Sequence, residues 1–262
     1  PPAPKLLTPS ATYKGQMMLK IKSTLALLAL LAGVTHAAPD AKEILLQADM
    51  ARGGGLPGLT WSIELEARDE EGEQKRSMTV KADANNNIVE FLAPEKVKGQ
   101  QMVMQGRNMW FVRPGLSKPV PMSPRQRLIG MASNGDVAST NYSGDYNAKL
   151  LAETSVNNED CYQLELSAAN KGVTYDKILY WVSKKRGVGV KAEFYTLSGK
   201  LFKFAEFDYG NEIRHDGRKI PFVSKMTIHD AIDKSKVTTL AYSAIKVVRI
   251  DPAIFNLNIR AD

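Results

Sequence analysis

Hydrophobic and polar residues alternate with a period of two along most of the chain after residue 58. The first such run sets Leu59, Trp61, Ile63, Leu65 and Ala67 between polar neighbours. This spacing predicts a strand with one apolar face and one wet face. Similar runs, separated by turn signals, predict further strands at 77–82, 88–92, 101–104, 109–112, 161–168, 178–182, 189–195, 201–209, 220–228 and 237–248. The pattern therefore indicates a mainly β protein of about ten or eleven antiparallel strands in a strongly curved sheet or barrel.

Helical spacing precedes the first strand. Asp40 is a candidate N-cap, and apolar residues follow it at helical intervals up to Ala48, before three glycines at 53–55. The rhythm breaks again between Arg113 and Tyr146, a stretch rich in proline and glycine. Within it, Ser123-Pro124 predicts a short helix that continues to Ile129. Long irregular segments inside a compact domain are often functional.

Residues 18–37 have the order of an export signal. A basic start at Met18–Lys22 is followed by an apolar run at 23–34 and by Thr35-His36-Ala37. A basic segment, an apolar core and small residues at a cleavage site, in this order, indicate a secretory signal peptide that is cleaved near Ala37. The apolar run is shorter than the roughly 20 residues of a membrane span. We expect translation to begin at Met17 or Met18, residues 1–17 to be an upstream tail outside the mature protein, and 38–262 to form a single domain.

Charge and cysteine content exclude several classes of protein. The chain has 35 basic and 28 acidic residues, a formal net charge of +7. Removal of the tail and signal takes away four of the bases, which leaves 31 against 28, or +3, and gives no case for nucleic acid. The lone Cys161 permits no intrachain disulfide and does not follow the cleavage site, where a lipid anchor would require it.

Motifs for catalysis are weak. The Gly53-x-Gly55-x-x-Gly58 fingerprint follows a helix and opens a strand, the reverse of a dinucleotide site. The Ser243-x-x-Lys246 pair lacks its companion motifs, and the two histidines beyond residue 38 lack zinc spacing. We therefore expect that this protein is not an enzyme and that it binds neither a cofactor nor a metal ion. A hydrolase with two convergent carboxylates stays as an alternative.

One segment resembles a known family. Gly106–Pro114, with the sequence GRNMWFVRP, resembles a hairpin motif of the LolA-like outer-membrane lipoprotein-sorting family. The link at Ala93–Gly99 and the helix at 40–52 are similar to family segments in the same order. The resemblance implies a half-closed barrel with a helical lid. It also implies a periplasmic, monomeric carrier that shields acyl chains of lipoproteins or free lipids. An inner-membrane transporter and an outer-membrane acceptor would be its partners.

The resemblance, taken with the excess of Met and aromatic residues on strands, points to an apolar cavity, although an ordinary hydrophobic core has the same pattern. The lid candidates are Ile44, Leu45, Ile129 and Met131. The cavity candidates are Trp61, Ile63, Leu65, Met78, Val80, Met102, Met104, Trp110, Trp181 and Phe222. In the characterised lipoprotein carrier of this family, an Arg-Pro pair at the start of the third strand helps to hold the lid. The matching stretch here, Val80–Asp83, lacks that pair. A second alternative is an adaptor that binds an RND-type membrane transporter through residues 113–146.

Overall fold

The computed structural model describes residue 2 and residues 39–70, 72–116, 118–139 and 141–257. The chain divides into two compact units, Pro1–Ala38 and Pro39–Asp262. Apart from residue 2, all described residues belong to the second unit. The predicted signal peptide and, apart from residue 2, the upstream tail lie outside the described residues.

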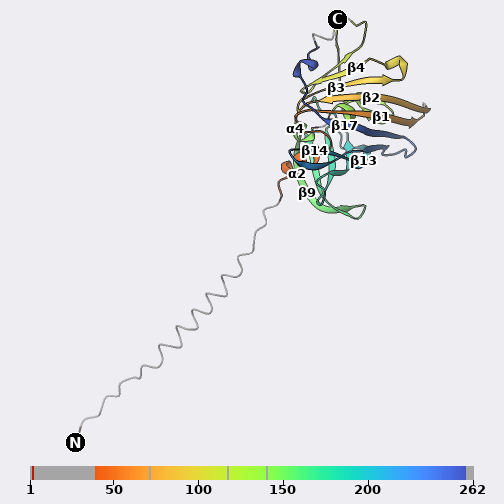
Figure 1. The fold of residues 1–262 in the computed structure, drawn as a ribbon. Helices are drawn as coiled ribbons and strands as arrows, with labels where there is room; N and C mark the ends of the chain where they lie inside the picture. The colour runs from red at the N-terminus through yellow and green to blue at the C-terminus, as the bar shows by residue number, and fades with distance from the viewer. Residues whose placement is uncertain (1, 3–38, 71, 117, 140, 258–262) are drawn as a thin grey trace. The chain divides into compact units, whose positions relative to one another are not determined.

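Thirteen strands of the described unit form one antiparallel sheet in the order β6-β5-β4-β3-β2-β1-β17-β16-β13-β12-β11-β10-β9. Figure 1 shows how the sheet curves, and its two edge strands, β6 and β9, do not pair with each other, so the sheet stays open. The strands are β1 (Leu59–Asp69), β2 (Gly72–Ala82), β3 (Asn86–Ala93), β4 (Gln101–Gln105), β5 (Asn108–Val112), β6 (Val120–Met122), β9 (Tyr146–Val156), β10 (Glu159–Ala168), β11 (Lys177–Ser183), β12 (Gly189–Tyr195), β13 (Leu201–Asp208), β16 (Lys225–Asp230) and β17 (Val237–Val247).

Two separate hairpins complete the β structure, namely β7 (Arg127–Ile129) with β8 (Ala132–Ser133), and β14 (Asn211–His215) with β15 (Arg218–Phe222). The mainly β, open half-barrel is thus confirmed, while the expected number of strands was too low. The largest omission is β9, an edge strand that is exposed along most of its length. Its sequence lacks a clear alternation because neither of its faces is fully buried.

The described helices are short: α2 (Ala41–Met50), α3 (Asn134–Ala138), α4 (Tyr142–Asp145) and the 3₁₀ turns η2 (Glu95–Val97) and η3 (Pro252–Phe255). Asp40 caps α2 as predicted, because its carboxylate accepts the backbone N–H of Lys42. The helix predicted at 123–129 is wrong. Residues 127–129 form β7, and the helices of this region lie further along, at α3 and α4.

The sheet packs apolar residues on both faces. On the first face, Ile63 lies opposite Met78, and Met78 opposite Phe91. These residues belong to a large buried cluster, here called the inner cluster, which also takes residues from β10 to β17 and from the helices. On the other face, Ile88, Val103, Val112 and Phe255 form a smaller outer cluster beneath η3. The hydrophobic core therefore lies mainly between the sheet and the short helices.

Candidate functional site

Eight of the ten predicted cavity residues lie together in the inner cluster, and each is at most 8% exposed. Trp61 contacts Phe222 edge to face, with ring centroids 6.4 Å apart. Methionine is prominent on this face, with five buried members in the cluster. Because Met is flexible and polarizable, such a surface can adapt to chains of different shape. The eight residues are Trp61, Ile63, Leu65, Met78, Val80, Met102, Met104 and Phe222.

The structure places the other two predicted residues on the opposite face. Trp110 pairs with Val103, which belongs to the outer cluster. Trp181 lies between two inner-cluster residues of β11, so its side chain points away from them, and its ring lies 4.7 Å from Lys191 Nζ. The large size of these tryptophans suggested an interior position, but strand register decides the face.

Four elements cover the inner cluster and are called the lid: α2, the β7–β8 hairpin, α3 and α4. Ile44, Leu45 and Ile129 of the predicted lid are buried in the inner cluster, and Met131 packs against it. Figure 1 shows α2 and α4 close together beside the sheet, and the two helices contact each other. Side chains of the sheet and of the lid thus pack against one another in the inner cluster.

The β7–β8 hairpin reaches the sheet at its turn. Gly130 has a φ of +53°, and a Cβ there would lie 2.5 Å from the Cβ of Ala67 and 2.4 Å from the hydroxyl of Thr238. The same hydroxyl accepts the backbone N–H of Met131 at 2.8 Å. Only glycine combines this backbone conformation with so close an approach. The turn therefore anchors one end of the lid on β1 and β17.

A buried ion pair joins the lid to the sheet. The side chains of Lys203 in β13 and Asp136 in α3 are each about 1% exposed, and Lys203 Nζ lies 2.8 Å from the Asp136 carboxylate. The ammonium also donates to the carbonyl of Met131 at 2.6 Å and to Ser133 Oγ at 3.4 Å. Asp136 in turn accepts from the Tyr175 hydroxyl and from the backbone N–H of Ser133. Every donor of the ammonium has an acceptor, which offsets the cost of burying the charge.

The sequence pattern does not reveal this pair in advance. Phe202 and Phe204 flank Lys203, and their size favours the opposite phase for the strand. In the structure, Lys203, Ala205 and Phe207 face inward, while Phe204 stacks on His229. A lysine that alternates in step with inward-facing apolar residues indicates a buried charge. Recognising it requires knowing which face of the strand points inward, and this strand has aromatic residues on both faces.

A second polar contact ties α2 to α4. The carboxylate of Asp49 accepts the backbone N–H of Tyr142 at 3.2 Å and of Ser143 at 2.7 Å. Burial raises the pKa of Asp49 from 3.8 to about 6, although these hydrogen bonds and nearby Arg52 act in the opposite direction. Asp49 therefore satisfies the free N–H groups at the start of α4 and orders this part of the lid.

Arg52, just beyond α2, is also buried, at 5% exposure. Its guanidinium carbon lies 4.4 Å from the ring centroid of Tyr142 and 5.2 Å from that of Phe207. Arg52 Nη1 has no hydrogen-bond partner, nor does the hydroxyl of Tyr180, which packs against the same two rings. Among the described residues, no carboxylate forms an ion pair with Arg52.

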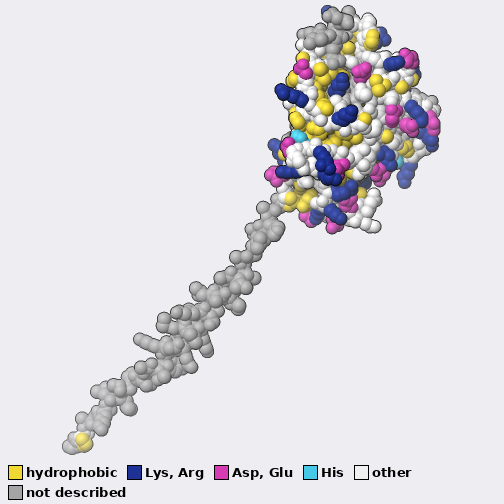
Figure 2. Space-filling model, in the orientation of Figure 1, with side chains coloured by type: hydrophobic (Ala, Val, Ile, Leu, Met, Phe, Trp, Pro, Cys, Tyr) yellow, Lys and Arg dark blue, Asp and Glu magenta, His cyan; other side chains and the backbone are white. Residues whose placement is uncertain are grey.

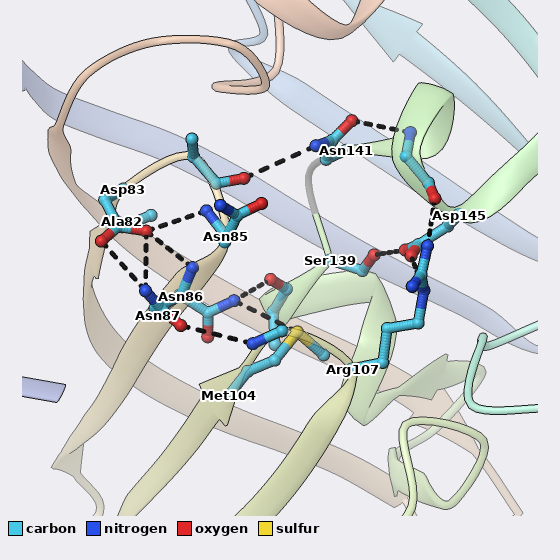
Figure 3. Close-up of a pocket in the computed structure, with 14 residues that line it drawn as sticks. Ala82, Asp83, Asn85, Asn86, Asn87, Met104, Arg107, Ser139, Asn141 and Asp145 are labelled. Carbon is cyan, nitrogen blue, oxygen red and sulfur yellow. Dashed lines mark hydrogen bonds and ion pairs between the residues drawn. The ribbon is translucent and has the colours of Figure 1, made fainter. Parts of the chain in front are cut away.

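A small polar pocket of about 120 Å³ lies where the lid meets two hairpin turns of the sheet (Figure 3). Arg107 pairs with Asp145 at 3.2 Å, and the Ser139 hydroxyl donates to the same carboxylate. Asp83 accepts the backbone N–H groups of Asn85 and Asn86. Both carboxylates of the pocket are thus occupied by structural contacts, which gives no support to an acid–base pair.

Other features of the described residues bear on the alternative functions. Basic and acidic side chains are interspersed on the face shown in Figure 2. In the described part of the chain, no three His, Cys, Asp or Glu side chains converge as metal ligands. No helix formed by those same residues has the length and apolarity needed to cross a bilayer. Residues 132–138, part of the segment considered for an adaptor, are buried in the lid.

An open antiparallel half-barrel with an apolar inner face under short lid helices defines the class of this protein. The chain belongs to the LolA superfamily. It shares 32% sequence identity with a LolA superfamily protein from Nitrosomonas europaea, over 85% of this chain and 100% of that one, with a TM-score of 0.74. A family model described as "Uncharacterized protein" matches residues 83–259.

More distant structures share the fold. A domain from Vibrio parahaemolyticus whose name refers to outer membrane lipoprotein sorting is 21% identical over 85% of this chain and 98% of its own, with a TM-score of 0.70. A DUF1329 family protein from Desulfovibrio piger is 19% identical over 84% of this chain and 97% of its own, with a TM-score of 0.68. No curated protein matches the chain.

Proposed function

We propose that this protein is an exported carrier that shelters acyl chains of lipoproteins or free lipids and moves them across the periplasm toward the outer membrane. The observation that carries the proposal is the inner cluster, a continuous apolar face rich in methionine that short lid segments cover. Membership of the LolA superfamily and the lipoprotein-sorting name of the Vibrio domain support it.

The energetics favour such a role. Burying an acyl chain contributes about 0.8 kcal/mol per CH₂ group, so a chain of sixteen carbons gains about 12 kcal/mol. That gain can offset the contacts that the lid loses when it moves away from the sheet. A carrier of this kind needs apolar contact area and a movable cover, and it needs no catalytic group. The proposal therefore includes binding without chemical conversion of the cargo.

Partners follow from the same role. A carrier of lipid must receive its cargo at one membrane and release it at another, because an acyl chain does not cross water unprotected. An inner-membrane transporter and an outer-membrane acceptor are therefore part of the proposal. The predicted signal peptide supports export to the periplasm.

The test compares the two faces of the sheet. Val80 of the inner cluster and Val103 of the outer cluster are both fully buried, so Val80→Thr and Val103→Thr should cost similar stability. Only Val80→Thr places a hydroxyl against an acyl chain. We expect it to weaken binding of a fluorescent fatty-acid probe about 5- to 30-fold, the equivalent of roughly 1–2 kcal/mol for an uncompensated hydroxyl, with Val103→Thr unchanged.

Lipids extracted from the protein after purification from periplasm, identified by mass spectrometry, give a second readout. The proposal expects acyl lipid at close to one molecule per protein. Protein that carries no lipid and fails to bind the probe would contradict it.

A further inference from the structure

Arg52 is the starting point, because its position is energetically unusual. Burying a charged group costs several kcal/mol unless hydrogen bonds and a counter-charge compensate. The inner cluster closes around Arg52, yet one of its terminal nitrogens has no acceptor. A buried donor without a partner is rare in folded proteins and requires an explanation.

Asp49, a buried carboxylate whose charge acts on Arg52, does not supply that acceptor. Its carboxylate bonds to the backbone N–H groups of Tyr142 and Ser143, which commits it to the start of α4. It acts on Arg52 only through its charge and forms no ion pair with it. The rings of Tyr142 and Phe207 hold the guanidinium by cation–π contacts and leave an N–H edge free.

Tyr180 brings a second free donor to the same place. Its ring lies 5.6 Å from Tyr142 and 6.2 Å from Phe207, the two rings that also contact Arg52. Its hydroxyl is buried without a partner and lies against Gly189, where a Cβ would come within 1.8 Å of it. Glycine at 189 therefore keeps the space in which the hydroxyl sits.

We propose that Arg52 and Tyr180 form a binding site for the oxyanion at the head of an acidic lipid, a carboxylate or a phosphate, whose acyl chain occupies the inner cluster. A guanidinium matches the two oxygens of such a group with two parallel hydrogen bonds, and the tyrosine hydroxyl adds a third donor. The free donors that are costly in the closed protein then acquire acceptors in the loaded one. Loading requires α2 and α4 to move, since the site is closed.

This inference rests on the proposed carrier function and narrows its cargo. An acyl chain linked to a protein by an ester or amide bond has no oxyanion of its own, whereas a free fatty acid or a phospholipid has one. Arg52 therefore favours free acidic lipid over the acyl chains of a lipoprotein.

The experiment measures binding of three lipids with the same acyl chain to the delipidated mature protein by isothermal titration calorimetry. Oleate presents a carboxylate, oleoyl lysophosphatidic acid a phosphate, and monoolein no charge. Hydrogen bonds to charged groups contribute roughly 1.5–3 kcal/mol, so we expect at least one of the two acidic lipids to bind about 10- to 100-fold more tightly than monoolein. The tighter of these two identifies the source of the oxyanion.

Two variants test the residues. Arg52→Met should reduce the preference for the acidic lipid to less than about threefold while monoolein binding stays unchanged, because only the charge-assisted bonds are lost. Tyr180→Phe removes a hydroxyl that has no well-formed hydrogen bond in the closed protein, where it lies close to Arg52, so the variant should fold normally and still reduce the preference several-fold. It carries the test if Arg52→Met fails to fold.

The outcomes separate the two proposals. Equal binding of all three lipids, or a preference that both variants retain, would overturn the oxyanion site and leave the carrier function standing. Failure of the unaltered protein to bind any of the three lipids would overturn the carrier function itself.

Discussion

Lys203 and Arg52 both place a positive charge in the apolar interior, but their surroundings differ. The ammonium of Lys203 donates hydrogen bonds to three groups of the lid, namely the Asp136 carboxylate, the Ser133 hydroxyl and the carbonyl of Met131. Arg52 lies against aromatic rings and keeps a donor without an acceptor. The comparison separates a cation that stabilises the closed structure from one whose donors are available to a ligand. It also shows that burial alone does not identify a binding residue, because hydrogen-bond satisfaction must be examined as well.

The largest loss of stability should come from breaking the buried ion pair between Lys203 and Asp136. Lys203→Met leaves Asp136 buried with an uncompensated charge, and we expect the free energy of unfolding to fall by about 3–5 kcal/mol. Urea denaturation measures this. Lys225→Met is the control: Lys225 pairs with Asp208 at the surface, so its loss should cost less than about 1 kcal/mol.

Arg52→Met gives the other half of this comparison. It removes cation–π contacts worth about 0.5–2 kcal/mol but also removes a buried charge with an unsatisfied donor. We expect a net change in the free energy of unfolding smaller than about 2 kcal/mol. A loss as large as that of Lys203→Met would mean that the two cations have the same structural role.

The pH dependence of stability should reveal Asp49. Its pKa is raised from 3.8 to about 6 by burial, so the folded protein binds a proton that the unfolded chain has released between these values. The stabilisation is therefore fully present only below pH 3.8 and is lost as the pH rises through about 6, so that about 2 kcal/mol of it disappears between pH 4 and 6.5. Asp49→Asn removes the titration. Unfolding free energies of both proteins, measured at pH 4 and 6.5, should diverge by this amount, and parallel values would show an ordinary carboxyl.

Two tyrosines make the smallest and most specific comparison. The Tyr175 hydroxyl donates to Asp136 at 2.5 Å, whereas that of Tyr180 has no partner. We expect Tyr175→Phe to lower the free energy of unfolding by about 1–3 kcal/mol, and Tyr180→Phe to leave it unchanged or raise it slightly. Thermal unfolding of the two variants decides the point. Equal losses would indicate that the Tyr180 hydroxyl is bonded in solution.

Alternation of residues predicted the antiparallel β fold and most strands, because long strands with one buried face carry that pattern in the sequence. The edge strand β9 lacked it, and the short helices of residues 134–145 have too few turns for a periodic signal. Eight predicted cavity residues share the inner cluster, but Trp110 and Trp181 do not, since their size gave no information on register. Arg52 and Lys203 depend on contacts between distant segments, which no local pattern encodes.

The three tryptophans allow one direct test of the central claim, that acyl chains occupy the inner cluster. Trp61 lies on the inner face, and Trp110 and Trp181 lie on the outer one. In the Trp110→Phe/Trp181→Phe double variant, fluorescence reports on Trp61 alone, and a brominated fatty acid quenches an indole only at close range. We predict saturable quenching of this variant at one lipid per protein, and none in Trp61→Phe, where only the outer tryptophans remain. Equal quenching of the two proteins, or quenching of the outer tryptophans alone, would contradict the account.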